Sequence, residues 1–498
     1  MKEKFFTQMK ALLGCFVLFS TLTISAQTYP KVNLQADHQL LIKKIIENRH
    51  VLDQLKEYES AMHQQILFQQ EKRSPNKGIT TDTLINGVRV IPVVFHIIHD
   101  NGIENIGDEQ VLNAIQLLNI DFSATNIDTI LGENTASQFA GRRANPAIEF
   151  RLARLDPDGN PTSAILRHQD ASANGVSYPV MATYAWDPQK YLNIFSVGGI
   201  SVEGMGEGTI VGMSLFPPTN PLTSLFTDDP MCDGVLIRHD AIGNIGTAEN
   251  LAGMGVNAQN RSLTHELGHY FNLYHPFQNF TEDNIYSAMY QGLGLIDGCA
   301  ESVAFMGPTE NLYGDYVDDT PPVTAASQVD GNYCIEVGSR NTCPNQVNGF
   351  GDEPDMVENY MDYQWGFCTN LFTLGQLERI NATLNGHRRN LWSYENLIAT
   401  GILEYNGIAS QSGTLFVNIY PNPAVEICTI TYQLPNDAQV KISVFDMLGR
   451  EITTPVNQYT GTGIHQLVLK KSDLGNSGIY FVNIKVDDNS KTCKVVFR

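Results

Sequence analysis

The stretch "LTHELGHYFNLYHPF" at residues 263–277 holds three of the twelve histidines in this 498-residue chain, together with one glutamate. Residues four apart lie on the same face of an α-helix, so a helix here would point His265 and His269 in one direction, beside Glu266. Zinc binds neutral imidazole nitrogens, and a helical H-E-x-x-H pair supplies two of them. If the helix ends near Asn272, the chain can return and bring His275 to the same ion. Three protein ligands leave a fourth position open for water, which is typical of a catalytic zinc site and not of a structural one.

A histidine pair at helical spacing is more often packed or solvated than bound to metal, and this alternative has to be weighed. From average residue usage, a chance match to H-E-x-x-H-x-x-x-x-x-H in a chain of this length has a probability on the order of one in a few thousand. The motif therefore favours a zinc site. By contrast, we interpret His96 and His99 in "VVFHIIHD" as residues of a strand.

Length and charge limit the class of protein. The chain is long enough for roughly two or three domains. Its formal net charge of −21, without a long basic stretch, argues against nucleic acid or an anionic membrane surface as the main partner.

Residues 1–26 combine early lysines, an apolar run from Ala11 and small residues up to Ala26, which predicts a secretory signal peptide. Cys15 in "LLGC" suggests a lipoprotein site instead, but the apolar run continues past it. No other segment approaches the roughly 20 apolar residues of a membrane-spanning helix.

Seven cysteines remain once the signal peptide is removed, and an exported protein tends to oxidise them. They are Cys232, Cys299, Cys334, Cys343, Cys368, Cys428 and Cys493. Four of them fall between residues 299 and 368, where disulfides would hold long loops together. Cys428 and Cys493 are candidates to pair with each other, and Cys232 is left without an obvious partner.

Residues 27 to about 75 have apolar side chains at three- and four-residue spacing and predict a helix, which "RSPNKG" then breaks. We interpret residues 27–87 as a pro-segment, with Lys72 and Arg73 as candidate processing positions. An ordinary helical extension is the alternative.

The pro-segment contains no cysteine, so a thiolate cannot block the metal in a precursor. Another group, such as a carboxylate, would have to do so, and Asp37 and Asp53 are candidates.

Residues 88–400 predict an α/β domain. Strands are expected in "VRVIPVVFHII", "IEFRLARL", "YLNIFSV", "GTIVGMSLF" and "GVLIRHDAI", and helices in "GDEQVLNAIQLLNIDF" and "TLGQLERINATLNGHRRNLW". The zinc helix, with Ser262 or Asn260 as its N-cap, would pack on a twisted, mostly parallel sheet. Residues 417–498 contain short alternating segments separated by turn residues, which predict an antiparallel β-sandwich.

The motif and a later turn together carry a family resemblance. "HELGHYFNLYH", followed by "ENYMDY" at 358–363, resembles the metzincin metalloproteases and, within them, the ulilysin-like pappalysin family. The resemblance covers about residues 88–395. It implies a secreted zinc endopeptidase with His265, His269 and His275 as zinc ligands and Glu266 as general base. It also implies Met361 beneath the metal and Tyr363 as a residue that steadies the reaction intermediate. Without the resemblance, Met361 would be interpreted as an ordinary residue of the hydrophobic core.

The same resemblance implies further features. "GDYVDDTPP" at 314–322 is similar to the family's calcium loop, with Asp315, Val317 and Thr320 as ligands; a solvated acidic turn is the alternative. The order of the cysteines implies disulfides Cys299–Cys343 and Cys334–Cys368. Asn272 departs from the usual metzincin pattern, which has glycine there. Since Asn tolerates positive φ better than other non-glycine residues, we expect the turn to His275 to be kept.

The C-terminal region resembles a type IX secretion sorting domain. "IYPNPA", "VFDMLGRE", "GIYFVNI" and the closing "KVVFR" carry this resemblance. It implies contact with the type IX machinery and export through the periplasm of a Gram-negative bacterium, to the cell surface or the medium. A fibronectin-like binding module is the alternative.

Two functions from different classes are therefore considered. The first is a zinc endopeptidase acting on proteins or peptides, and the second is a surface adhesin that keeps the fold without turnover. The retained Glu266 favours the enzyme, because an adhesin has no use for a general base beside zinc.

In "MDYQWGFC" at 361–368 no acid follows Asp362, which predicts a pocket at Phe367 that takes apolar or uncharged side chains after the scissile bond.

Overall fold

The structure is a computed structural model and describes most of the chain between residues 36 and 498. The described ranges are 36–72, 84–126, 139–201, 210–253, 261–278, 315–323, 335–343, 352–403 and 416–498, apart from short gaps inside some of them. The predicted signal peptide, residues 1–26, lies outside these ranges. None of the helices within them is long and apolar enough to cross a membrane.

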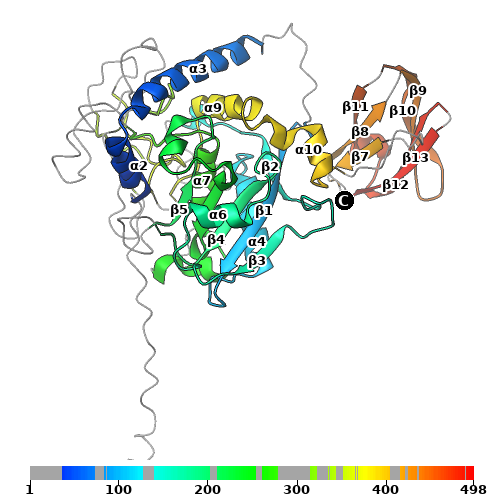
Figure 1. Ribbon diagram of the computed structural model, residues 1–498. Coiled ribbons are helices and arrows are strands. Elements are labelled where there is room, and N and C mark those ends of the chain that lie inside the picture. Colours follow the sequence, from blue (N-terminus) through cyan, green and yellow to red (C-terminus); the bar gives the residue numbers. More distant parts are fainter. Residues whose placement is uncertain are drawn as a thin grey trace, which may run out of the picture.

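A six-stranded sheet forms the centre of the larger unit (Figure 1), with the order β2-β1-β4-β6-β5 and with β3 paired to β1. Its strands are β1 (Arg89–His99), β2 (Ile148–Leu152), β3 (Ile165–Gln169), β4 (Leu192–Val197), β5 (Gly212–Ser214) and β6 (Gly234–Arg238). All pairs are parallel except β5 with β6, which is antiparallel. The predicted mostly parallel sheet is confirmed. β3 was not expected, because its sequence "ILRHQ" is mostly polar and only Ile165 is buried.

Helices cover both faces of this sheet, and the burial of β1 agrees with this arrangement. Ten of its eleven residues are buried, as in parallel strands that lie between two helical layers. The helices of the larger unit are α4 (Asp108–Asp121), α6 (Tyr178–Tyr184), α7 (Ser262–Tyr270), α9 (Leu374–Asn385) and α10 (Tyr394–Ala399). His96 and His99 are both buried on β1, which confirms them as strand residues.

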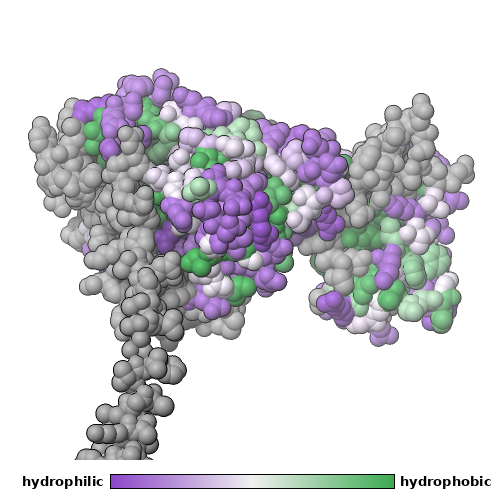
Figure 2. All heavy atoms as spheres, turned by 60° about the horizontal axis from the view of Figure 1, so that its bottom comes forward, coloured by the Kyte–Doolittle hydropathy of each residue, from purple (hydrophilic) through white to green (hydrophobic). Residues whose placement is uncertain are grey.

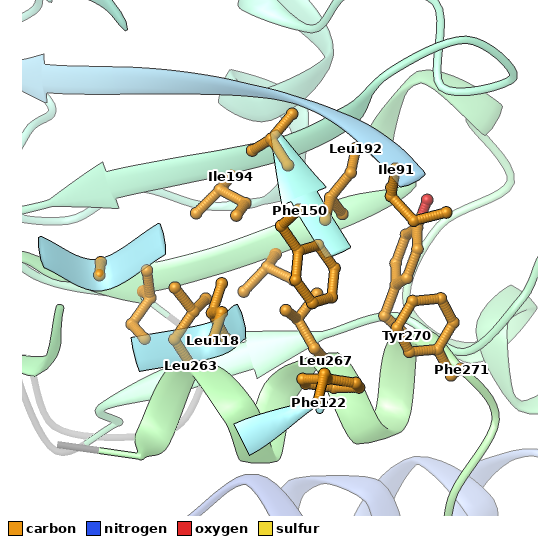
Figure 3. Packing of buried hydrophobic residues seen from close by; sticks show 14 of the residues in the cluster. Ile91, Leu118, Phe122, Phe150, Leu192, Ile194, Leu263, Leu267, Tyr270 and Phe271 are labelled. Carbon is orange, nitrogen blue, oxygen red and sulfur yellow. The ribbon is translucent and has the colours of Figure 1, made fainter. Parts of the chain in front are cut away.

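The main hydrophobic core lies between the sheet and the helices α4 and α7 (Figure 3). Leu263, Leu267 and Tyr270 project from α7 toward Phe150 of β2 and Ile194 of β4. Because one face of α7 is fixed in this core, the opposite face is held in a defined position. Figure 2 shows hydrophilic residues over much of the visible described surface of this unit, with hydrophobic residues in small separate groups.

The N-cap prediction for α7 was wrong. Arg261 occupies that position without a side-chain cap hydrogen bond, and Ser262 is already helical. Asn260 lies outside the described residues. The start of α7 is held by buried contacts of Arg261, not by a local polar cap.

The N-terminal region folds into two helices where a single one was expected, namely α2 (Ala36–Glu47) and α3 (Val51–Lys72). The break falls at residues 48–50, and α3 lies beside α9 in Figure 1. Apolar residues of both helices, including Leu41, Ile45 and Leu55, pack against Phe216 and Tyr274 of the larger unit. The break lets the two helices follow different parts of that surface.

Residues 416–498 form the predicted antiparallel sandwich, with one sheet in the order β10-β9-β12-β13 and another in the order β11-β8-β7. The strands are β7 (Phe416–Tyr420), β8 (Ile427–Leu434), β9 (Ala438–Phe445), β10 (Glu451–Thr460), β11 (Gly463–Lys470), β12 (Gly478–Val486) and β13 (Asn489–Phe497). The suggested pairing of Cys428 with Cys493 was wrong, because neither cysteine is in a disulfide. They lie on strands of different sheets, and stacked sheets stand about 10 Å apart, farther than the roughly 4.4–6.8 Å between the Cα atoms of a usual disulfide.

Candidate metal centre

Helix α7 and the turn after it bring the three motif histidines together. His265 and His269 lie on one face of α7, which ends at Tyr270. The backbone N–H of Leu273 then donates to Gly268 O over 2.9 Å, and Asn272 has φ of 74°. The expected positive φ at Asn272 is therefore confirmed, and the chain turns back there to deliver His275.

The Nε2 atoms of the three rings converge. His275 Nε2 lies 3.3 Å from His265 Nε2 and 3.0 Å from His269 Nε2. Among the described residues, these three histidines form the one group of potential ligands close enough to hold a metal ion.

Hydrogen bonds on the opposite ring atoms fix the tautomers. The Nδ1–H of His265 donates to Tyr360 O and that of His269 to Leu273 O, each over 2.7 Å. The Nδ1–H of His275 donates to Gln278 Oε1 over 3.2 Å. Each Nε2 lone pair is thereby left facing the other two, an arrangement that a cation stabilises. Burial lowers the pKa of His265 to about 4, which keeps the ring neutral, as a metal ligand must be. The donor set therefore fits zinc.

Glu266 is buried beside the edge strand β5. A Cβ atom on Gly212 would lie 2.6 Å from Glu266 Oε1, so the close approach of the two elements needs glycine at this position. Glu266 lines hollows on both sides of the three histidines. Its carboxylate is thus placed where a substrate bound across the site would reach it.

Met361 packs against α7, and Tyr363 lies beside two of the three histidines. A Cβ atom on Gly268 of α7 would overlap Met361 Sδ, so the buried methionine sits directly against the helix that carries the histidines. The ring centroid of Tyr363 lies 5.6 Å from that of His265 and 4.7 Å from that of His275.

A buried carboxylate, that of Asp121, contacts residues next to the histidines and was not predicted from the sequence. Asp121, the last residue of α4, accepts hydrogen bonds from Arg261 Nε over 3.1 Å, Thr264 Oγ1 over 2.8 Å and Tyr360 OH over 3.0 Å. Tyr360 is also the residue whose carbonyl accepts from His265. No local signal marks Asp121, because its partners follow it by 140 to 239 positions in the chain.

A cavity of about 70 Å³ lies on the Tyr363 side of Glu266. Its lining includes the apolar residues Ile210 and Val211 as well as the polar residues Arg261, Asp362, Gln364 and Thr369. Phe367, the predicted specificity residue, lies outside the described residues, and its role stays a prediction.

The three predicted calcium ligands come together around Asp315. Its Oδ1 accepts from Val317 N over 3.1 Å, and both of its carboxylate oxygens accept from Thr320 Oγ1 over 2.9 Å. Burial raises the pKa of Asp315 well above its ordinary value.

The cysteines and the candidate blocking groups are only partly described. Cys343 and Cys368 are each disulfide-bonded, while Cys299 and Cys334, their predicted partners, lie outside the described residues. Cys232 is a buried free thiol that donates to Tyr178 O over 3.1 Å. Asp53 is excluded as a blocking group because its side chain is 87% exposed and pairs with Lys56. The side chain of Asp37 is not described.

Two family models match the chain. Residues 249–385 match the pregnancy-associated plasma protein-A family of peptidases, which spans the histidine motif and the methionine turn. This part of the chain is similar to the pappalysin family of metalloproteases. Residues 418–498 match the secretion system C-terminal sorting domain, which confirms the predicted sorting domain and type IX export from a Gram-negative cell.

Individual relatives belong to the same class. An extracellular metalloprotease of Neurospora crassa is 27% identical over 260 residues, or 47% of this chain and 71% of that protein. Another from Arthroderma otae is 24% identical over 304 residues, or 61% of this chain and 77% of that protein. Mature mirolysin of Tannerella forsythia in complex with a cleaved peptide is 29% identical, with a TM-score of 0.45, and covers 63% of this chain and 98% of that one. The family match and the extracellular metalloprotease relatives show that the chain is a metalloendopeptidase, as expected.

Proposed function

We propose that a Gram-negative cell exports this chain as an inactive precursor of a zinc endopeptidase, and that Glu266 is its general base. The convergence of the Nε2 atoms of His265, His269 and His275, with Glu266 on the same helix, carries the proposal. Zinc held by these rings supplies an acidified water molecule and a Lewis acid for the substrate carbonyl.

The chain's own groups move the proton and hold the developing charge. Glu266 accepts a proton from the attacking water and passes it to the leaving amine. The Tyr363 hydroxyl donates a hydrogen bond to the oxyanion that develops on the scissile carbonyl. Met361 shapes the floor of the site from beneath α7, and an apolar side chain of the substrate enters the pocket at Phe367.

The proposal divides the chain into a signal peptide (1–26), a pro-segment (27–87), a protease domain (88–400) and a sorting domain (417–498). The packing of α2 and α3 against the protease domain supports the pro-segment assignment. Leu41 of α2 borders the hollow that Glu266, His269 and His275 line, so the pro-segment covers part of the metal site.

Calcium and two disulfides complete the proposal. The high pKa of buried Asp315 supports calcium at Asp315, Val317 and Thr320, because a cation offsets the cost of burying a carboxylate. The disulfides are Cys299–Cys343 and Cys334–Cys368, in loops that follow the zinc turn.

Substitution Glu266→Ala tests the general base. After removal of the pro-segment, the variant is expected to retain about one zinc ion per chain and to lose casein hydrolysis, since the histidines remain and the base does not. Glu149→Ala is the matched control, because Glu149 lies on β2 and pairs with Arg151 away from the site. Casein hydrolysis by Glu266→Ala at the control rate would contradict the assigned mechanism.

A further inference from the structure

A second hollow lies across Glu266 from the Tyr363 cavity. Met213 and Ser214 of β5 line it, together with Phe216, Phe226 and Tyr178. Glu266, His269 and His275 form its other wall, and the Phe216 and His269 ring centroids are 5.4 Å apart. The hollow therefore opens directly onto the metal site.

The side chain of Leu41 reaches into this region from the pro-segment. It is 6% exposed and packs in a cluster with Phe216, Leu222 and Tyr274, with Phe226 at the margin of that cluster. Leu40, the preceding residue, is buried in the adjoining cluster with Met213. Two consecutive leucines of the pro-segment thus occupy apolar surface beside the histidines.

The strand that forms this wall is suited to hold an extended peptide. β5 is the last strand in its sheet and, among the described strands, pairs with β6 alone. Edge strands offer backbone N–H and C=O groups to an added strand, while alternate side chains of that strand enter pockets. A peptide along β5 would pass Gly212 and Glu266 and place a side chain at Met213 and Phe216.

We propose that this hollow is a substrate subsite for an apolar side chain of leucine, methionine or phenylalanine size, and that Leu41 covers one side of it in the precursor. The proposal rests on the proposed endopeptidase function. Gln364 and Gly366 belong to the 361–368 segment predicted to form the pocket after the scissile bond, and both line the Tyr363 cavity. The hollow across Glu266 therefore serves a residue before that bond. Apart from Glu266 and the histidines, its described lining is apolar or uncharged, which selects against charged substrate side chains.

A peptide library cleaved by the activated enzyme and read by mass spectrometry tests the preference. At one position before the cut, peptides with Leu, Met or Phe are expected to have kcat/KM about ten- to a hundredfold above peptides with Asp or Lys. Equal kcat/KM values at every position before the cut would overturn the proposal. Absence of all peptide cleavage, or cleavage that survives Glu266→Ala, would instead count against the proposed function.

A charge placed in the hollow provides a second test. Ser214→Asp is expected to raise kcat/KM for the Lys peptide relative to the Leu peptide by about tenfold or more, because the lysine gains a partner. Ser224→Asp is the matched control, because Ser224 is exposed on the neighbouring 3-10 helix (Pro221–Leu225), and it should keep the wild-type preference. An unchanged preference in active Ser214→Asp enzyme would overturn the proposal.

The precursor offers a rescue experiment. Leu41→Lys is expected to raise the basal activity of the intact full-length chain, and Ser214→Asp combined with Leu41→Lys is expected to restore low activity by pairing the two charges. If the double variant is as active as Leu41→Lys alone, Leu41 does not cover the hollow that Ser214 lines.

Discussion

The pro-segment is joined to the zinc turn by a buried ion pair, which leads to a quantitative prediction for Glu59→Ala. Glu59 of α3 is 6% exposed and accepts from Arg379 Nη1 over 2.6 Å and from Arg379 Nη2 over 3.0 Å. Its Oε1 also accepts from the Tyr274 hydroxyl over 2.8 Å. Arg379 in turn donates through Nε to Asn272 O over 3.1 Å. Glu59 therefore contacts the turn that delivers His275.

The size of the effect follows from the burial of Arg379. Burial alone would lower the pKa of this guanidinium, but the Glu59 carboxylate outweighs that effect and raises the pKa above its ordinary value. Removing one partner of such a buried pair costs about 3–5 kcal/mol, because the other charge is left uncompensated. Docking of the pro-segment should therefore weaken by a factor of about 150 to 4,000. Other contacts of α3 remain, such as that of Gln65 Nε2 with Ala382 O over 2.8 Å.

The assay is hydrolysis of a fluorogenic peptide by the intact precursor, with electrophoresis to show that the chain is uncleaved. Glu59→Ala should raise the initial rate by about a hundredfold or more, up to the rate of the activated enzyme. Asp53→Ala is the control on the same helix, because Asp53 is exposed and its loss should cost under about 0.5 kcal/mol. Wild-type latency in a zinc-loaded Glu59→Ala precursor would refute the reasoning, as would equal activation by Asp53→Ala.

Two further predictions concern the protease domain. Gly268→Ala places a Cβ against Met361 Sδ, so it should lower zinc affinity at least about tenfold in a chelator competition, whereas Gly141→Ala, with open space around it, should not. Burial lowers the pKa of His96 to about 3, so between pH 6.5 and 3 the unfolded chain binds a proton that the folded chain does not. Stability measured by denaturant unfolding should therefore fall as the pH falls, and His96 should account for about 1.6 kcal/mol of the loss from pH 6.5 to 5; this share should be missing in His96→Gln but present in a variant of exposed His50. A pH profile that is the same in wild type and His96→Gln would contradict the assignment to this group.

The zinc ligands could be predicted because their determinants are local in the sequence. His265, His269 and His275 lie within eleven positions, and helix geometry plus one permissive turn residue, Asn272, brings them together. The parallel strands could also be predicted, because strands that are buried on both faces have long apolar runs in the sequence, such as that of β1.

The parts that could not be predicted depend on partners far away in the chain. No sequence motif marks Asp121, because its hydrogen bonds to Arg261 and Thr264 form only when α4 packs against α7. The start of α7 was assigned to a local polar cap, whereas Arg261 is fixed by Asp121 and by the carbonyls of Gly366 and Thr369. The break between α2 and α3 likewise reflects the surface on which they pack, since no glycine or proline marks it.

The two ends of the zinc helix are thus held by different kinds of partner. At its start, Arg261 is paired with Asp121, and both residues belong to the protease domain. At its end, the turn at Asn272 is held by Arg379, whose carboxylate partner Glu59 belongs to the removable pro-segment. Removal of the proposed pro-segment, residues 27–87, would therefore leave the first anchor intact and take the ion-pair partner from the second. We expect the turn that carries His275, and not the helix that carries His265 and His269, to be the part of the metal site that responds to activation.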